Sequence, residues 1–345
     1  MRSSDANEDY WFDAAPLAES PRRRSAAEAL SSVLPGKQHS DAQQEALLAF
    51  ATANGLSYIS WLAPRERSEP LPSLVLDDAS MTLISGHAPQ RFEFGNHGWR
   101  FWTGEGDGSP SRRGYIAIRH GMALPHLYLD ANGPGAATLL AAASTVVNAA
   151  GFFDFERTSV DESAVDAFRK RAVALDLPTS AGFTAYVDAG RPSERTAAAG
   201  RKAPFGRNSP FGRKSQARAS DEAAAARAED LAAAEALLTG PAGPLLAELA
   251  DSFDVEVEEN WVFAYSTFGE LSTLEPEIWA WAFGSASRLV DVLEIWGLDA
   301  TELRQQAWYT SDRIERPARV DGALQALVPK PGSRIGKLLF GRGPE

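Results

Sequence analysis

The fold is decided by residues 91–130, which read RFEFGNHGWRFWTGEGDGSPSRRGYIAIRHGMALPHLYLD. Apolar and polar side chains alternate along the expected strands, which is the pattern of an antiparallel sheet with one buried face. The apolar set is Phe92, Phe94, Trp99, Phe101, Ile116, Ile118, Leu127 and Leu129. The opposite set is Arg91, Glu93, Arg100, Trp102, Tyr115, Arg119, His126 and Tyr128. We therefore predict a half-buried sheet whose outer face is charged, aromatic and exposed.

A long aromatic helix is predicted at residues 276–296. Pro276 suits the first turn of a helix, where its missing N–H costs nothing, and Gly297 suits the end. Ile278, Trp281 and Leu289 belong to one apolar stripe, and a second apolar face runs beside it. Because a small isolated meander is not stable in water, we expect this helix to cover the inner face of the sheet.

The fold class that these patterns indicate is α+β, with an antiparallel sheet packed against helices. A helix is expected to begin at Asp41, and residues 253–266 are expected to form a hairpin that turns at Glu259 and Asn260. The five expected segments are a disordered head (1–40), an N-terminal α+β half with the sheet (41–190), a disordered basic insert (191–220), a C-terminal α+β half (221–309) and a flexible basic tail (310–345).

Charge is distributed unevenly along the chain. The insert 191–220 holds eight Lys or Arg residues and one Glu, whereas the whole protein has a net charge of −12. Such a segment could contact an anionic membrane surface, an acidic protein or nucleic acid, or it could be a linker with incidental charge. The acidic remainder argues against tight binding of a nucleic-acid duplex. The expected contact residues are Arg201, Lys202, Arg207, Arg213, Lys214 and Arg218.

Composition excludes several classes of protein. With no cysteine in 345 residues, disulfides, thiolate metal sites and cysteine nucleophiles are ruled out. The first residues lack the apolar core of a secretion signal, so a cytoplasmic location is expected. Residues 136–153 carry no charge, but they are rich in alanine and include Thr138, Ser144 and Asn148. A buried or interfacial helix is therefore a better interpretation of them than a membrane span.

No catalytic, metal-binding or cofactor-binding motif is recognisable. The five histidines lack the helical spacing of a metal site, so a metal centre would have to assemble from separate strands. No Gly-x-Ser-x-Gly motif occurs anywhere in the sequence. Glu256 and Glu258 share one face of an expected strand, and we expect that face to be solvated. We predict no catalytic residue, no metal and no cofactor.

Several blocks of the chain resemble an uncharacterised family of actinobacterial, often membrane-associated proteins. These blocks are FATANGLSY (50–58), RFEFGN (91–96), RGYIAIR (113–119), LPHLYLD (124–130), FDVEVEENWVFAY (253–265) and PEIWAWAF (276–283). Members often end in a basic stretch followed by a transmembrane helix, and SRIGKLLF (333–340) resembles that basic stretch. The insert 191–220 departs from the family pattern. The shared motifs are structural, so the resemblance implies kinship and no particular activity.

Two functions remain open from the sequence. The first is a non-enzymatic interaction or structural protein, peripheral to the inner face of a membrane. The second is a small-ligand-binding protein or enzyme whose site lies on the outer face of the 91–130 sheet. The second site would converge from His97, Arg100, Trp102, His120 and His126. The binding residues expected on this face are Arg100, Trp102, Arg119, His126 and Tyr128.

Overall fold

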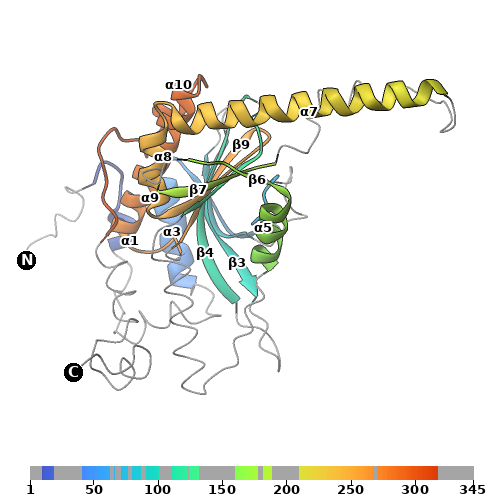
Figure 1. Cartoon of the computed structure of the whole chain (residues 1–345). Helices are drawn as coiled ribbons and strands as arrows, with labels where there is room; N and C mark the ends of the chain where they lie inside the picture. Colours follow the sequence, from blue (N-terminus) through green and yellow to red (C-terminus); the bar gives the residue numbers. More distant parts are fainter. Residues whose placement is uncertain are drawn as a thin grey trace, which may run out of the picture.

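The computed structural model describes residues 10–18, 41–62, 66, 71–76, 80–86, 91–100, 110–122, 124–131, 160–177, 182–188, 210–267 and 270–317. In this part of the chain, helices pack on a nine-stranded antiparallel sheet with the strand order β1-β2-β3-β4-β9-β8-β5-β7-β6 (Figure 1). The predicted α+β class is confirmed.

The elements follow one another along the chain as helices and strands in mixed order. The strands are β1 (Ser57–Leu62), β2 (Ser80–Gly86), β3 (Phe92–Arg100), β4 (Pro110–Arg119), β5 (Leu127–Ala131), β6 (Val173–Ala174), β7 (Phe183–Val187), β8 (Phe253–Glu258) and β9 (Trp261–Ser266). The helices are α1 (Ala15–Ala18), α3 (Asp41–Ala53), α5 (Val160–Arg171), α7 (Pro210–Thr239), α8 (Gly243–Ala250), α9 (Pro276–Ile295) and α10 (Thr301–Arg304).

The C-terminal hairpin is inserted into the middle of the sheet. β9 pairs with β4, and β8 pairs with β5, so strands that follow each other in the N-terminal half are separated by β8 and β9. The hairpin turns at Glu259 and Asn260, as predicted, and Glu259 has a φ of 53°. The two halves expected from the sequence therefore share one sheet.

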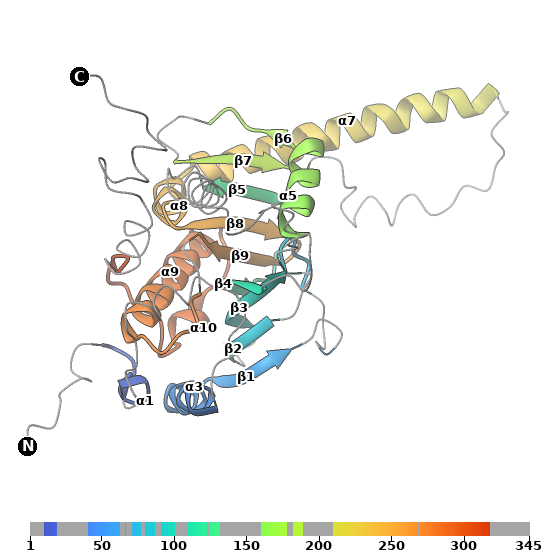
Figure 2. The ribbon, with the colours of Figure 1, turned by 90° about the horizontal axis from the view of Figure 1, so that it is seen from below.

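One face of the sheet packs on α9, as the sequence predicts. The ring centroid of Phe94 lies 5.1 Å from that of Phe283 and 6.2 Å from that of Trp279, both on α9. Phe92 packs against Trp308, with 5.1 Å between ring centroids. Figure 2 shows α1, α3, α8, α9 and α10 together on this side of the sheet. The first hydrophobic core of the protein lies between these helices and the sheet.

The prediction that the outer face of the sheet is exposed is wrong, because this second face is also covered. α5 lies over this face, opposite α9 (Figure 2), and Phe168 of α5 belongs to a second core. Glu93 and Tyr115 are fully buried, and Tyr128 is 2% exposed. Alternation along a strand assigns side chains to two faces, but it does not reveal what packs on each face.

Parts of the segments expected to be disordered are ordered. In the head, Phe12 is buried and its ring lies 5.1 Å from that of Phe283. In the insert, α7 begins at Pro210. In the tail, Thr310 N–H donates to Ser287 Oγ at 3.0 Å. The described structure thus includes 10–18, 210–220 and 310–317, and the rest of each range lies outside the described residues.

Residues 136–153 also lie outside the described part of the chain, so the interpretation of this stretch stays a prediction. Within the described residues, no helix combines the length and the apolar character that a membrane crossing requires.

Candidate functional site

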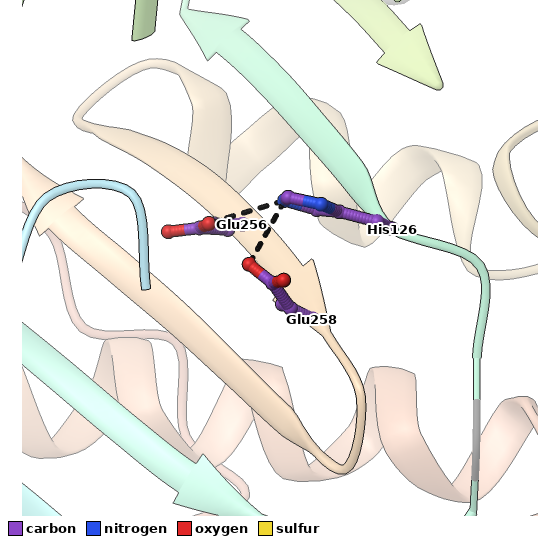
Figure 3. Close-up of side chains that lie close together, drawn as sticks. All are labelled: His126, Glu256 and Glu258. Atoms are coloured by element: carbon purple, nitrogen blue, oxygen red, sulfur yellow. Dashed lines mark hydrogen bonds and ion pairs between the residues drawn. The ribbon is translucent and has the colours of Figure 1, made fainter. Parts of the chain in front are cut away.

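Two carboxylates and one imidazole meet on the face of the sheet opposite α9. Glu256 and Glu258 lie on β8, where strand alternation turns both to this face, while Val255 and Val257 belong to the first core. His126 directly precedes β5, and the pairing of β5 with β8 sets it beside both carboxylates. Figure 3 shows the imidazole turned toward the two side chains. These three residues are called the His126 cluster below.

The cluster is compact and almost completely buried. The Nε2 atom of His126 lies 3.2 Å from Oε1 of Glu256 and 3.3 Å from Oε2 of Glu258. The exposed fractions of the three residues are 8% for His126, 0% for Glu256 and 5% for Glu258. One ring nitrogen of His126 therefore faces both carboxylates. A proton or a cation bound at this nitrogen would also contact the two carboxylates.

Glu256 is held by donors that come from two other parts of the chain. The backbone N–H of Leu74 donates to both of its carboxylate oxygens, at 3.0 and 3.2 Å. The Tyr265 hydroxyl donates to Oε2 at 2.6 Å, and Ser73 Oγ lies 3.3 Å from the same atom. Burial first, and then the neighbouring Glu256 charge, raise the pKa of Tyr265 well above its usual value. Tyr265 therefore stays protonated and keeps donating.

An aromatic ring of α5 closes the site toward solvent. The ring centroid of Phe168 lies 4.5 Å from that of His126. The next residue of α5, Arg169, binds Asp130 of β5 at 2.6 Å and so fastens the helix to the sheet. Residues 71–76 cover the Glu256 side of the cluster through the contacts of Ser73 and Leu74 given above. The cluster is thus an interior site.

A surface hollow that the structure does describe lies elsewhere. It is lined by Leu124, Pro125, Ala233, Ala236, Leu237, Gly240, Pro241, Ala242, Ile295 and Trp296. None of these lining residues has a titratable side chain, so the hollow offers apolar contact and no acid–base or metal chemistry.

The binding residues expected on the outer face are placed differently from the prediction. His126 and Tyr128 are buried, and His126 is part of the cluster. Arg119 is partly exposed at the end of β4, opposite Trp261 of β9. The side chain of Arg100 and the whole of Trp102 lie outside what the structure describes. The expected open site on this face is therefore not supported.

The two other histidines of the expected site are also buried. His97 lies on β3 and is 1% exposed, and His120 follows β4 and is 3% exposed. In the described residues, the group of metal-ligand type contains His126 and neither of these two.

The expected basic contact residues fall mainly outside the described structure. Arg201, Lys202 and Arg207 lie between residues 188 and 210, in a stretch that the structure does not describe. Arg213, Lys214 and Arg218 lie in the first turns of α7, where the backbone is described and the side chains are not.

Sequence reasoning placed Glu256 and Glu258 in solvent, and this prediction is wrong. Burial of these two residues could have been predicted from the neighbouring strand. This strand, β9, reads WVFAYS and is apolar on both faces. Trp261 and Phe263 of β9 lie opposite Glu258 and Glu256 and belong to the second core. A strand with two apolar faces needs cover on both sides, and so do its neighbours.

Comparisons with protein-family models, with curated proteins and with solved structures find no match to this chain. The family resemblance noted in the sequence therefore stays a prediction.

The cluster brings together donor atoms that could hold an ion. An imidazole nitrogen and two carboxylate oxygens can share protons or hold a cation. Phe168 and residues 71–76 pack directly against the cluster. The arrangement therefore supports a structural or ion-binding role.

His120 makes the stability of the fold depend on pH. Burial lowers its pKa to about 4, and the Met122 N–H donates to its Nδ1 at 3.3 Å, which fits the neutral ring. The unfolded chain has a histidine pKa near 6.5, so it binds the proton more tightly. The stabilisation due to the neutral ring is therefore fully present above about pH 6.5, and it decreases as the pH falls toward 4.

We expect the free energy of unfolding of the wild type to fall by about 3 kcal/mol more than that of His120→Gln between about pH 7 and pH 4. Urea denaturation of both proteins at the two pH values measures this difference. An equal loss in wild type and variant would contradict the assignment.

Proposed function

We propose that this is a non-enzymatic interaction protein that binds the anionic inner face of a membrane through the basic segment at and before the start of α7. The observation that carries the proposal is the position of α7. This helix runs past the edge of the folded body, and its N-terminal part projects away from the sheet (Figure 1). Figure 2 shows the same projection from a second direction.

The C-terminal part of α7 is anchored to the body. Ala234 and Leu238 are buried, and the indole N–H of Trp296 donates to the Leu237 carbonyl at 3.2 Å. Ala234 is the first buried residue of α7 among those whose exposure the structure describes. The helix from Pro210 to Ala234 spans about 36 Å at 1.5 Å per residue.

This distance matters because the rest of the protein is acidic. The whole chain carries −12, although residues 191–220 alone carry +7. Electrostatic interactions in physiological salt decay over about 8 Å, and Arg213, Lys214 and Arg218 lie about 24–32 Å along α7 from Ala234, so these charges are largely uncoupled from the acidic body. An anionic surface could then attract the segment without repelling the body.

The alternative of an enzyme or small-ligand site on the outer face is less well supported. Glu93, Tyr115 and Tyr128 on that face are buried beneath other elements. Binding through a projecting segment needs no cleft, which agrees with the described structure better.

Co-sedimentation with vesicles tests the proposal. The wild type is expected to bind vesicles that contain phosphatidylserine and to ignore vesicles of phosphatidylcholine alone. Each basic residue near such a surface contributes about 1 kcal/mol, so replacing Arg213, Lys214 and Arg218 by Gln should weaken binding about a hundredfold.

The matched control removes the same charge from exposed positions elsewhere, through Lys170→Gln, Arg227→Gln and Arg313→Gln. It should bind nearly as well as the wild type. Equal binding by both triple variants would rule out the basic segment as the contact. Retention on a polyglutamate resin, with binding to neither type of vesicle, would assign the segment to an acidic protein and overturn the membrane proposal.

A further inference from the structure

The His126 cluster has the composition and the spacing of a metal site. One imidazole nitrogen and two carboxylate oxygens, from three buried residues, all lie within 4.8 Å of one another. We propose that His126, Glu256 and Glu258 bind a divalent transition metal ion, for which Zn²⁺ is the best fit. The site would be structural, joining the chain before β5 to the hairpin strand β8.

Two of the three distances between donor atoms match those around a tetrahedral ion, and the third, between the carboxylate oxygens of Glu256 and Glu258, is no more than 4.8 Å. Zinc lies about 2.0–2.2 Å from nitrogen and oxygen ligands, which places neighbouring ligands about 3.4 Å apart. His126 Nε2 lies 3.2 Å from the nearer oxygen of Glu256 and 3.3 Å from that of Glu258. An ion could therefore bind between these atoms without displacing either strand. A water molecule would complete the tetrahedron.

The outer contacts orient Glu256 in the way that protein metal sites require. Leu74 N–H and the Tyr265 hydroxyl fix its carboxylate, as described above, so that Oε1 faces His126. Partners of this kind orient the ligands of a metal and raise its affinity. Glu256 is consequently ordered before an ion arrives, which lowers the entropic cost of binding.

Charge favours a divalent cation at this position. Glu256 and Glu258 lie on one face of one strand, and both are buried, which makes their ionised forms costly unless they are compensated. A doubly charged cation would neutralise two carboxylates while His126 binds as the neutral imidazole. The other ring nitrogen, Nδ1, is buried and has no hydrogen-bond partner in the described structure. Nε2 is thus the atom that faces the cluster.

The type of ligand selects the metal. Calcium and magnesium prefer sites made entirely of oxygen, whereas imidazole combined with carboxylates suits zinc and its neighbours in the first transition series. Zinc is also found with three protein ligands and a water molecule in the fourth position of its tetrahedron. These preferences make Zn²⁺ the appropriate probe.

The test uses the full chain after removal of metals with a chelator. Titration with Zn²⁺ is expected to saturate at one ion per chain, and to raise Tm by on the order of 5 °C at free Zn²⁺ a hundredfold above Kd. In Glu258→Gln both effects should be lost. The matched control is Glu259→Gln, the exposed neighbour in the turn, which should behave as the wild type.

A second variant distinguishes a metal site from a hydrogen-bonded triad. In His126→Gln the amide can still donate to the carboxylates, but a good metal ligand is gone. Loss of the Zn²⁺-dependent rise in Tm in this variant is expected. The proposal is overturned if Zn²⁺ leaves the Tm of the wild type unchanged, or if His126→Gln and Glu258→Gln respond to Zn²⁺ as fully as the wild type does.

Discussion

Replacing Phe94 by Ala is expected to lower the free energy of unfolding by about 4 kcal/mol. Phe94 is fully buried, and its ring packs against Trp279, Phe283 and Trp308 at centroid distances of 6.2, 5.1 and 5.6 Å. Truncation removes the transfer free energy of the ring and leaves a cavity between the sheet and α9. Because neighbouring large rings cannot collapse easily into this space, the full cost is expected.

Urea denaturation followed by tryptophan fluorescence measures the effect of Phe94→Ala as a lower midpoint with an unchanged slope. Leu48→Ala on α3 is the control, since Leu48 is 50% exposed and should change stability by less than about 0.5 kcal/mol. A loss of less than about 1 kcal/mol in Phe94→Ala would show that the contact between the sheet and α9 does not stabilise the fold.

Replacing Glu256 by Ala is expected to cost a similar amount, about 4 kcal/mol. This loss of stability comes from broken hydrogen bonds and not from lost apolar packing. The carboxylate accepts hydrogen bonds from Leu74 N–H and from the Tyr265 hydroxyl, and it also pairs with His126. Its removal leaves these buried groups without their partner, and each unsatisfied donor costs about 1–3 kcal/mol.

Chemical denaturation of metal-free protein measures the effect of Glu256→Ala, so that ion binding does not contribute. Glu235→Ala provides the matched control, because Glu235 is exposed on α7 and alanine is a good helix former. If Glu256→Ala were as stable as this control, the network around Glu256 would have no role in holding residues 71–76 against the sheet.

The sequence predicted the inner face of the sheet well because its signal is local. Phe92 and Phe94 alternate with polar residues, and this alternation alone assigns them to one face. The aromatic helix at 276–296 is apolar around much of its circumference, which required it to be buried on more than one side. The sheet and the helix each have an apolar surface that must be buried, and the sequence therefore predicted that they pack against each other.

Alternation along the strands did not predict that the opposite face of the sheet is buried. Its residues include Glu93, Tyr115 and Glu256, whose polar atoms suggest contact with water. Tyr115 is buried in the second core with Phe168 of α5, and Glu256 is buried beneath residues 71–76, where the Leu74 N–H donates to it. A buried polar residue is recognisable only from its partners, and those of Glu256 include Leu74 and His126, which are distant in sequence.

The sequence by itself determined the strands at 92–100 and 253–266, the helix at 276–296, and where the C-terminal hairpin turns. The tertiary structure alone decided that β8 and β9 lie between β4 and β5, and it thereby brought His126 to within 3.3 Å of two carboxylates more than a hundred residues away. The physical reason is that side-chain periodicity is a local property of the backbone. The choice of strand neighbour depends on contacts across the whole chain, which no local pattern encodes.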